Sequence, residues 1–298
     1  MTDLSIIIVS YNTAEMTEKC LTNLLSVLEE NKDVSMEVIV VDNASMDNTK
    51  EVLEKMNNRF KEQGQKLIIE LGNKNLGYSK ANNKGLLLSS GKYILFLNSD
   101  VLMNVISFKN LLNYFERDPK LGVLTVKVVL VNGEIDPASH RGFPTIWRSL
   151  CYYAGLEKVF GKIPLLNNFF GGYHLTSRSL SKDHEIDSPT GAFYLSRKDI
   201  LDKLKGFDED FFMYGEDLDL SYRVKDLGYK VLYVPTYTVT HLKYQSGIKS
   251  TDQGTKKKTQ SYFYEAMKIF YNKHYASNTP KPVNSFVFFI INQKAKYS

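Results

Sequence analysis

Apolar residues in the first third of the chain fall into short continuous runs separated by amphipathic stretches. The runs predict buried strands at residues 4–9, 37–41, 66–71 and 93–97. Between the runs, apolar residues recur with helical spacing and predict helices at residues 17–28, from 49 onward and at 79–88. Buried strands that alternate with helices build a mostly parallel sheet with helices on both faces. The predicted fold class is therefore α/β, with a Rossmann-like sheet.

The pattern beyond residue 100 is less regular. Further strands are predicted at residues 122–131, 192–196, 229–234 and 238–241, and further helices at 107–116, 198–204, 217–225 and 260–271. Residues 136–181 show little periodicity and are rich in Tyr, Phe, Trp and Gly, which is typical of an insertion or a lid. Residues 247–259 predict a polar linker. We therefore expect one domain over residues 1–245 and a helical extension over residues 246–298.

The cysteine content favours a protein of the cytosol, and the net charge limits the kinds of partner. The net charge of +5 gives mild attraction to phosphate-bearing partners or anionic lipid and is too small to imply nucleic acid. Cys20 and Cys151 lie far apart and fit neither a disulfide framework nor a zinc site, so buried free thiols in a reducing compartment are expected. The first residues lack the basic region of a secretion signal, and no stretch reaches the roughly 18–20 apolar residues that span a bilayer.

The C-terminal residues 286–292 are apolar and have two interpretations. With Lys281, Lys294 and Lys296 around them, they are suited to lie on a membrane surface. They are equally suited to form a helix that closes the core. The expected location is therefore cytoplasmic, with peripheral contact at the inner face of the membrane as an open alternative.

Two of the predicted strands end on an aspartate, Asp42 and Asp100. In an open parallel sheet, ligands bind beyond the carboxyl ends of the strands. The first strand leads into Ser10-Tyr-Asn-Thr without glycines, so the dinucleotide-binding fingerprint is absent, and no Walker A loop is present either. These absences exclude most dehydrogenases and NTPases with such a sheet.

An acidic and aromatic block at residues 206–223 is the strongest candidate for catalytic chemistry. Its carboxylates stand between Phe and Tyr residues that partly shield them from water, which suits a general base. A structural interpretation is also available. Acidic residues in a first helical turn complement the helix dipole, and Asp219 and Arg223 have the spacing of an i,i+4 ion pair.

The ordered series of motifs resembles the family 2 glycosyltransferases, which have a GT-A fold, and most closely the branch of rhamnosyltransferases and other bacterial polysaccharide-assembly enzymes. The motifs are residues 5–12 (SIIIVSYN), 41–45 (VDNAS), 75–83 (NLGYSKANN), 96–100 (FLNSD), 190–193 (TGAF), the block at 206–223, and His241. Each motif alone is weak, but the series follows the family's order from residue 3 to about 275. The resemblance implies a nucleotide-binding half over residues 1–100 and an acceptor half over 101–245.

The resemblance implies a nucleoside diphosphate sugar as donor, with dTDP or UDP as the nucleotide and rhamnose as the leading sugar. The residues expected to contact the donor are Ser10, Asn12, Asp42, Asn75, Gly77, Ala81, Asn82, Asn98 and Ser99. For Asp42 an Asx-turn or helix cap is the structural alternative. For residues 75–83 the alternative is an ordinary loop and helix start.

A metal site is implied by the same resemblance. Asn98-Ser99-Asp100 occupies the place of the family's Asp-X-Asp motif, and its first Asp is an Asn here. Asp100 is therefore the expected ligand for Mg²⁺ or Mn²⁺, and His241 the expected second ligand. A lone His at a strand end is otherwise more often a hydrogen-bonded structural residue.

Catalysis is expected at the acidic helix. The resemblance assigns Asp217 as the general base and Glu216 as an aid to acceptor binding, with Gly191 and Ala192 leaving room beneath the sugar and the acceptor. A base that deprotonates the attacking hydroxyl in a single displacement inverts the anomeric configuration. The expected acceptor is a cell-surface glycan or a lipid-linked saccharide. For residues 190–193 a tight turn that enters a strand is the structural alternative.

Two rival functions fit parts of the same pattern. A nucleotidyltransferase on a similar sheet needs a glycine-rich basic loop after the first strand, and residues 10–15 offer none. A non-catalytic nucleotide-sugar or glycan-binding protein fits Asn98, but the presence of Asp100, Asp217 and His241 argues against it. The aromatic segment either stacks on sugars, meets a lipid carrier or forms a small satellite core. Its aromatic residues are Trp147, Tyr152, Tyr153, Phe169, Phe170 and Tyr173.

Overall fold

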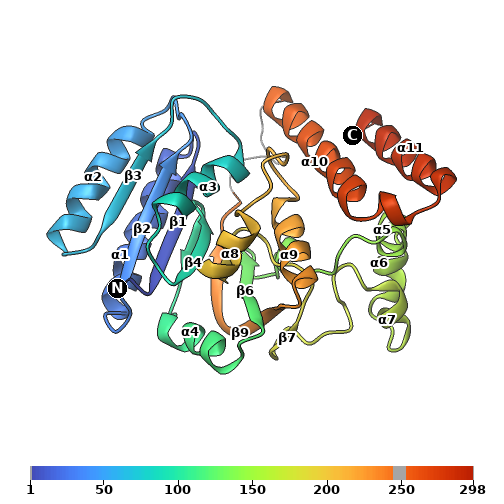
Figure 1. Cartoon of the computed structure of the whole chain (residues 1–298), viewed down its shortest axis with the longest axis horizontal. Helices are drawn as coiled ribbons and strands as arrows, with labels where there is room; N and C mark the ends of the chain where they lie inside the picture. The colour runs from blue at the N-terminus through green and yellow to red at the C-terminus, as the bar shows by residue number, and fades with distance from the viewer. Residues whose placement is uncertain (1, 244–252, 298) are drawn as a thin grey trace.

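The computed structural model describes residues 2–243 and 253–297 and has a mixed sheet at its centre (Figure 1). The strands are β1 (Leu4–Ser10), β2 (Met36–Asp42), β3 (Leu67–Leu71), β4 (Tyr93–Asn98), β5 (Val101–Met103), β6 (Leu121–Leu130), β7 (His184–Glu185), β8 (Phe193–Arg197) and β9 (Lys230–His241). The helices of the domain are α1 (Ala14–Glu30), α2 (Thr49–Glu62), α3 (Tyr78–Leu88), α4 (Phe108–Arg117), α8 (Lys198–Leu204) and α9 (Glu216–Asp226). The remaining helices are α5 (Ile146–Tyr153), α6 (Leu156–Phe160), α7 (Leu166–Phe170), α10 (Gln253–His274) and α11 (Lys281–Tyr297), with short 3-10 turns η1 (Pro137–Ser139) and η3 (Ala276–Asn278).

The strand order is β3-β2-β1-β4-β8-β6-β9-β5, and β7 pairs with β9. Strands β1 to β4 are parallel to one another, as are β6 and β9. Strand β8 runs antiparallel to both β4 and β6. The predicted α/β fold, with a mostly parallel sheet, flanking helices and C-terminal helices, is confirmed.

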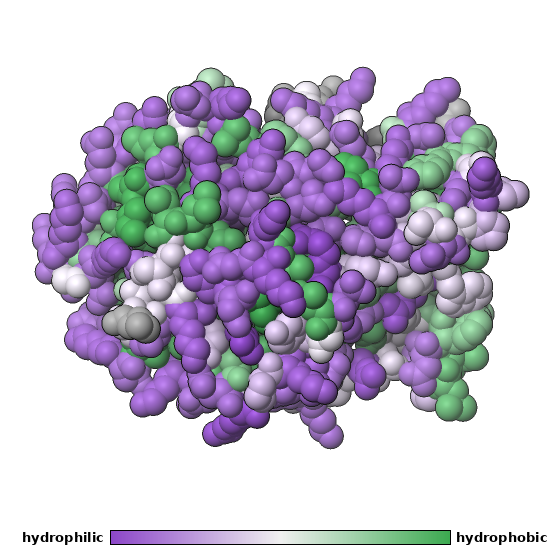
Figure 2. Space-filling view, viewed as in Figure 1, coloured by the Kyte–Doolittle hydropathy of each residue, from purple (hydrophilic) through white to green (hydrophobic). Residues whose placement is uncertain are grey.

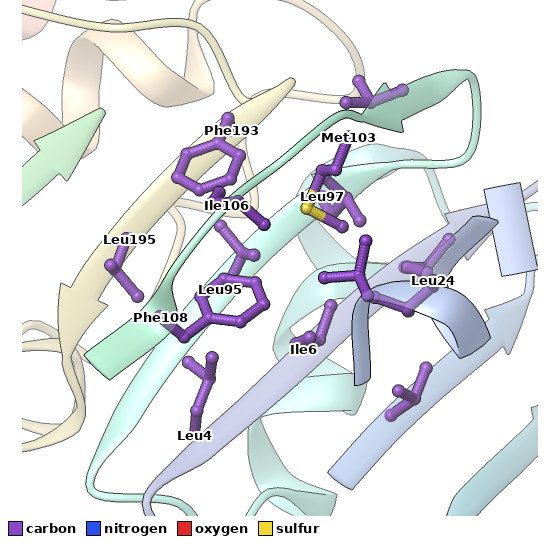
Figure 3. Packing of buried hydrophobic residues seen from close by; sticks show 14 of the residues in the cluster. Leu4, Ile6, Leu24, Leu95, Leu97, Met103, Ile106, Phe108, Phe193 and Leu195 are labelled. Atoms are coloured by element: carbon purple, nitrogen blue, oxygen red, sulfur yellow. The ribbon is translucent and has the colours of Figure 1, made fainter. Parts of the chain in front are cut away.

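Alternation along the strands builds two cores, one on each face of the sheet. In β1, Ile6 and Ile8 face α1, α2 and α4, whereas Ile7 faces α3, α8 and α9. Successive side chains of a strand point to opposite faces, so a strand that is apolar throughout requires helices on both. Figure 3 shows the first core, where Leu4, Ile6 and Leu95 meet side chains from α1 and α4. Because both faces are covered, the edge where β1, β2 and β4 end is left for ligands.

The predicted boundaries differ from the observed ones mainly in the second half. The strands predicted at residues 229–234 and 238–241 are one strand, β9, whose register against β6 shifts between Val234 and Thr238. Pro235 lies at the shift, and a proline cannot donate a ladder hydrogen bond, which explains why the sequence suggested two strands. Strands β5 and β7 were not predicted.

The C-terminal extension is helical, as expected, with one correction. The linker predicted at residues 247–259 lies partly outside the described residues, and its part from Gln253 onward belongs to α10. Helix α11 packs on α10 through Tyr271 and Phe288, whose rings are 5.5 Å apart, while Phe286 and Phe289 remain exposed. In the described residues, no helix is long and apolar enough to cross a membrane.

The predicted insertion at residues 136–181 contributes no strand of the main sheet. It contains η1 and the short helices α5, α6 and α7, which lie beside α10 and α11 at the right of Figure 1. Phe143 packs, partly buried, against a small cluster of Phe211, Leu218 and Phe270, whose members lie outside the insertion. The three interpretations of the aromatic segment stay predictions. The division into a nucleotide-binding half and an acceptor half stays a prediction.

Candidate active site

The ends of three parallel strands bring several of the predicted residues together. Ser10 pairs with Asp42 in the register of β1 and β2, and Val9 pairs with Asn98 in the register of β1 and β4. Ser99 and Asp100 follow directly in the turn between β4 and β5. The polar side chains predicted from separate motifs therefore lie along one edge of the sheet, where open α/β sheets bind ligands.

The loops after β1 and β2 are tied to each other. The Asp42 carboxylate accepts hydrogen bonds from the backbone N–H of Ser45, three residues on, at 3.3 and 3.2 Å. Asp42 therefore stabilises the turn after β2, although an Asx-turn would use the N–H two residues on. Ser45 Oγ in turn accepts from the backbone N–H of Asn12, and Asn12 Oδ1 accepts from that of Met46. Asn12 has a φ of 52°, a backbone conformation that Asn tolerates better than most residues. The structural role of Asp42 is thus observed, and its role in donor binding stays a prediction.

The loop that precedes α3 is fixed against the acidic block. Asn75 Oδ1 accepts hydrogen bonds from the Asn43 side chain and from the backbone N–H of Gly77. Gly77 has a φ of 83°, and a Cβ there would lie 2.5 Å from the carbonyl oxygen of Phe212. Only glycine therefore suits this position.

Ala81 and Asn82 are buried within α3. Ala81 belongs to the second core, and the Asn82 amide donates to the carbonyl of Tyr78 at 3.0 Å. Their predicted contact with the donor is untested, and the contacts observed for them are structural.

Tyr78 connects the two halves of the site and was not singled out from the sequence. Its hydroxyl lies 2.9 Å from Asn98 Oδ1 and 3.2 Å from the carbonyl oxygen of Gly191. Burial, followed by the nearby carboxylates of Glu216 and Asp217, raises the pKa of this phenol well above its usual value. Tyr78 therefore stays a neutral hydrogen-bonding group at any physiological pH.

Asp100 and His241 lie side by side, as a shared metal site requires. The Asp100 Oδ1 to His241 Nε2 distance is 3.2 Å, and the pairing of Val101 with His241 in β5 and β9 holds the two residues together. His241 Nδ1 lies 2.8 Å from Asp136 Oδ2, and Lys243 Nζ lies 2.7 Å from Asp136 Oδ1. All three of Asp100, Asp136 and His241 are buried.

Buried charges compensate one another in this cluster. Burial opposes the charge on His241, but hydrogen bonds to Asp100 and Asp136 outweigh it and raise its pKa to about 9. Burial would raise the pKa of Asp136, but His241 and Lys243 hold it well below its usual range. Without a cation, the imidazolium of His241 is the positive charge between the two carboxylates.

The same arrangement fits a divalent cation. A histidine that binds a metal usually donates its other ring N–H to a carboxylate, and Asp136 is placed to accept it from Nδ1. This bond leaves His241 Nε2 facing Asp100, so the two predicted ligands present one nitrogen and one carboxylate to a common point. Across residues 2–243 and 253–297, no group of three or more His, Cys, Asp or Glu side chains is arranged to hold a metal. The remaining ligands of a cation held here would be water and phosphate oxygens, as Mg²⁺ commonly has.

Asp217 lies in the first turn of α9 and is held by an arginine that the sequence did not single out. Asp217 Oδ2 accepts from Arg141 Nη2 at 2.6 Å and from the backbone N–H of Gly191 at 3.2 Å. Asp217 Oδ1 accepts from the backbone N–H of Leu218 at 2.7 Å. Burial disfavours the charge on Arg141, but Asp217, Tyr173 and Asp136 together outweigh burial and raise the arginine pKa above its ordinary value. Each carboxylate oxygen has about two lone pairs, so Oδ1 keeps acceptor capacity for a substrate hydroxyl.

Glu216 is buried beside Asp217, and its Oε2 has no hydrogen-bond partner. Burial, together with the negative charge of Asp217, raises its pKa to about 8. Glu216 is therefore largely neutral at pH 7 and carries a proton that it can donate in a hydrogen bond. A neutral carboxylic acid next to a charged carboxylate agrees with different roles for the two residues.

The other acidic residues of the block have structural partners. Asp219 pairs with Arg223 at 2.7 Å, as the i,i+4 spacing predicts, and its second oxygen lies 2.8 Å from His274 Nε2 of α10. Asp208 and Asp210 both pair with Lys273 of α10. These contacts fix the C-terminal helix against the acidic block.

Comparisons with known proteins agree with this geometry. The family model described as Glycosyl transferase family 2 matches residues 5–198. A poly-β-1,6-N-acetyl-D-glucosamine synthase of Staphylococcus aureus (strain COL) is 25% identical over 232 residues, which cover 78% of this chain and 48% of that protein. An N-acetylglucosaminyl-diphospho-decaprenol L-rhamnosyltransferase of Mycobacterium tuberculosis is 27% identical over 258 residues, 83% of this chain and 78% of that protein. The chain thus spans about half the length of the synthases that it matches.

Solved structures share the fold. The mannosyltransferase PcManGT from Pyrobaculum calidifontis, in complex with GDP-Man and Mn²⁺, has a TM-score of 0.58 at 17% identity, over 98% of this chain and 68% of that one. Staphylococcus aureus TarS in complex with UDP has a TM-score of 0.53 at 20% identity, over 96% of this chain and 70% of that one. With the family model covering well over half of the sequence, the chain belongs to glycosyl transferase family 2 and has a GT-A fold.

Proposed function

We propose that this protein is a glycosyltransferase that moves a sugar from a nucleoside diphosphate donor to a hydroxyl of a cell-surface glycan or lipid-linked saccharide, with metal dependence and inversion at the anomeric carbon. One chain of contacts carries the proposal. Asp217 binds the backbone of Gly191, whose carbonyl meets the Tyr78 hydroxyl, which also meets Asn98 at the strand edge. The proposed general base, Asp217, is therefore connected through only a few contacts to the strand edge at Asn98, where the diphosphate is expected to bind.

Different residues have different roles in the proposed reaction. The edge formed by Ser10, Asp42 and Asn98 receives the nucleotide. A divalent cation held by Asp100 and His241 would neutralise the charge that develops on the departing diphosphate. Asp217 accepts the proton of the acceptor hydroxyl as that oxygen attacks the anomeric carbon, and Arg141 keeps the Asp217 carboxylate in place. Because one displacement occurs, the product has the opposite anomeric configuration.

We further propose rhamnose as the sugar, with dTDP or UDP as the nucleotide. Two relatives support this class of donor, since one is an L-rhamnosyltransferase and the TarS structures contain UDP or UDP-GlcNAc. The Mn²⁺ in the mannosyltransferase structure supports a divalent cation.

The test is the release of nucleoside diphosphate from a panel of dTDP- and UDP-sugars, with Mg²⁺ or Mn²⁺ and with a chelator. We expect slow hydrolysis of one donor that depends on the cation. If no donor is hydrolysed, binding of UDP and dTDP with cation is measured next. Failure of both nucleotides to bind would refute the proposal.

The base is tested by Asp217→Asn. Loss of general base catalysis is expected to lower turnover by roughly 10²–10⁴-fold while nucleotide binding is unchanged. The substitution also leaves Arg141 without its carboxylate, so the unfolding free energy of the variant must be measured alongside. Undiminished turnover in a folded variant would exclude Asp217 as the base.

A further inference from the structure

Most large hydrophobic side chains that are exposed in the described part of the chain lie in two segments. They are Ile146, Trp147, Leu150, Tyr152, Tyr153, Val159, Ile163, Leu165, Leu166 and Phe169 in the first, and Val283, Phe286, Phe289 and Ile290 in the second. Figure 2 shows two hydrophobic regions along the right edge of the molecule, one over α5–α7 and one over α11. Soluble proteins rarely expose apolar side chains in such concentration without a partner.

The two segments adjoin each other. Lys294 of α11 lies over the ring of Tyr153 in α5, with 5.3 Å between its Nζ and the ring centroid. The Tyr153 hydroxyl also contacts Met267 Sδ of α10, on which α11 packs. The two segments that carry the exposed apolar side chains therefore lie next to each other, and we call their combined surface the lateral face.

The charges on the lateral face have one sign. Lys158 and Lys162 lie in the first segment, and Lys281, Lys294 and Lys296 flank the apolar residues of α11. Residues 281–297 contain no acidic residue. The single acidic residue of residues 146–173, Glu157, is buried and binds the backbone and ring of His174. Within residues 146–173 and 281–297 the face thus offers lysines and apolar side chains and no exposed acidic side chain, which complements an anionic lipid surface.

The aromatic residues are of the kind that lie at a membrane interface. The rings of Trp147 and Phe169 pack at a tilt of 55° with their centroids 4.9 Å apart. The Trp147 Nε1–H donates to the Phe169 carbonyl, so this polar group is satisfied without water. Tyr152 and Tyr153 are neighbours with partly exposed rings. Trp and Tyr are enriched where a protein meets the headgroup region of a bilayer.

From these observations we propose that the lateral face docks on a bilayer that contains anionic phospholipid. The apolar side chains of α5–α7 and α11 enter the interface, and the lysines meet the headgroups. Neither segment crosses the membrane. The inference does not depend on the proposed donor or acceptor. The lateral face is nevertheless connected to the candidate active site, because the insertion that carries α5–α7 also carries Arg141, the partner of Asp217.

The experiment uses the only tryptophan of the chain, Trp147, as a reporter on the face itself. The full chain is mixed with vesicles of phosphatidylcholine alone or of phosphatidylcholine with phosphatidylglycerol, without any nucleotide sugar. We expect co-sedimentation with the anionic vesicles, a blue shift of Trp147 emission, and quenching by phospholipids brominated in their acyl chains. No sedimentation, or sedimentation without any change at Trp147, would overturn the proposal.

Matched substitutions locate the contact. Leu165→Asp removes an apolar side chain that is 85% exposed on the lateral face, and Leu87→Asp removes one that is 86% exposed on α3. Because both side chains point into solvent, neither change disturbs a core. We expect about tenfold weaker vesicle binding for Leu165→Asp and no change for Leu87→Asp, since a leucine transferred out of water contributes at least about a factor of ten.

Four further results decide against the proposal. Equal losses from Leu165→Asp and Leu87→Asp would show that binding is not specific to the lateral face. Equal binding to vesicles of phosphatidylcholine alone would refute the role of the lysines, as would insensitivity to salt. If the protein does not bind vesicles but forms a dimer that Leu165→Asp dissociates, the lateral face is instead an interface with a second copy of the chain. Since every measurement is made without donor, these failures are separate from a failure of the transfer assay.

Discussion

Replacing Glu216 by glutamine should stabilise the protein at neutral pH, and this gain should disappear in acid. In the folded chain, burial and the charge of Asp217 raise the Glu216 pKa from an ordinary value of 4.5 to about 8. A folded-state pKa above the unfolded one means that the folded protein binds the proton more tightly. The stability that this proton contributes is fully present below pH 4.5 and is lost as the pH rises towards 8.

The size of the effect follows from the shift. One pKa unit corresponds to about 1.4 kcal/mol, so between pH 4.5 and pH 7 the wild type loses roughly 3 kcal/mol of unfolding free energy through this group. Glutamine has a similar shape and does not ionise, so Glu216→Gln should avoid this loss. We expect the variant to be more stable by up to roughly 3 kcal/mol at pH 7, with a difference that shrinks to the cost of the amide in acid.

Chemical denaturation of both proteins at several pH values between 4.5 and 8 measures the difference. Glu54→Gln, on the exposed surface of α2, is the control for the same replacement away from the site. A gap between Glu216→Gln and wild type that stays constant over the same range would refute the neutral state of Glu216. A variant that becomes relatively less stable towards pH 8 would show that the carboxylate form is the one the fold prefers.

Three further substitutions test the packing and the site. Gly85→Ala should lower the unfolding free energy by about 1–3 kcal/mol, because its Cβ would lie 2.4 Å from Ile7 Cγ2, and an unchanged denaturation midpoint would contradict this packing. Asp136→Asn should weaken Mn²⁺ by about 10–100-fold, because the amide orients His241 less well than the carboxylate does. A metal titration of donor hydrolysis measures this change, and unaltered metal dependence would argue against His241 as a ligand. Gly77→Ala should weaken UDP binding in calorimetry, because its Cβ would meet a backbone carbonyl of the acidic block, and full affinity would mean that this loop does not shape the donor site.

Much of the sheet could be predicted from sequence because its strands are short apolar runs with helices between them. The carboxyl ends of β1, β2 and β4 must then share an edge, so the strand pattern alone is enough to expect Ser10, Asp42 and Asn98 near one another. The parallel register confirms that they adjoin. The fold therefore follows from a local pattern, repeated along the chain.

The partners of the site residues could not be predicted in the same way. Arg141 meets Asp217 across 76 residues, and Asp136 meets His241 across 105. Arg141 and Asp136 stand at the start of the poorly periodic segment, where the sequence pattern predicts no strand, although Arg141 forms an isolated antiparallel bridge with Ser188. Nothing in the local sequence distinguishes Arg141 from the other arginines, and only the tertiary structure reveals that it is buried against a carboxylate.

The ion pair between Arg141 and Asp217 also bears on how this scaffold can be re-engineered. Residues 136–181 resemble an exchangeable module, since they add helices beside the sheet and no strand to its centre. A chimaera that receives this module from another enzyme would nevertheless lose the guanidinium that faces Asp217, unless the donor sequence supplies one at the same point. An unpaired buried carboxylate costs about 3–5 kcal/mol. A successful graft should therefore begin after Arg141 rather than before it, so that recipient and module are joined on the far side of the pair.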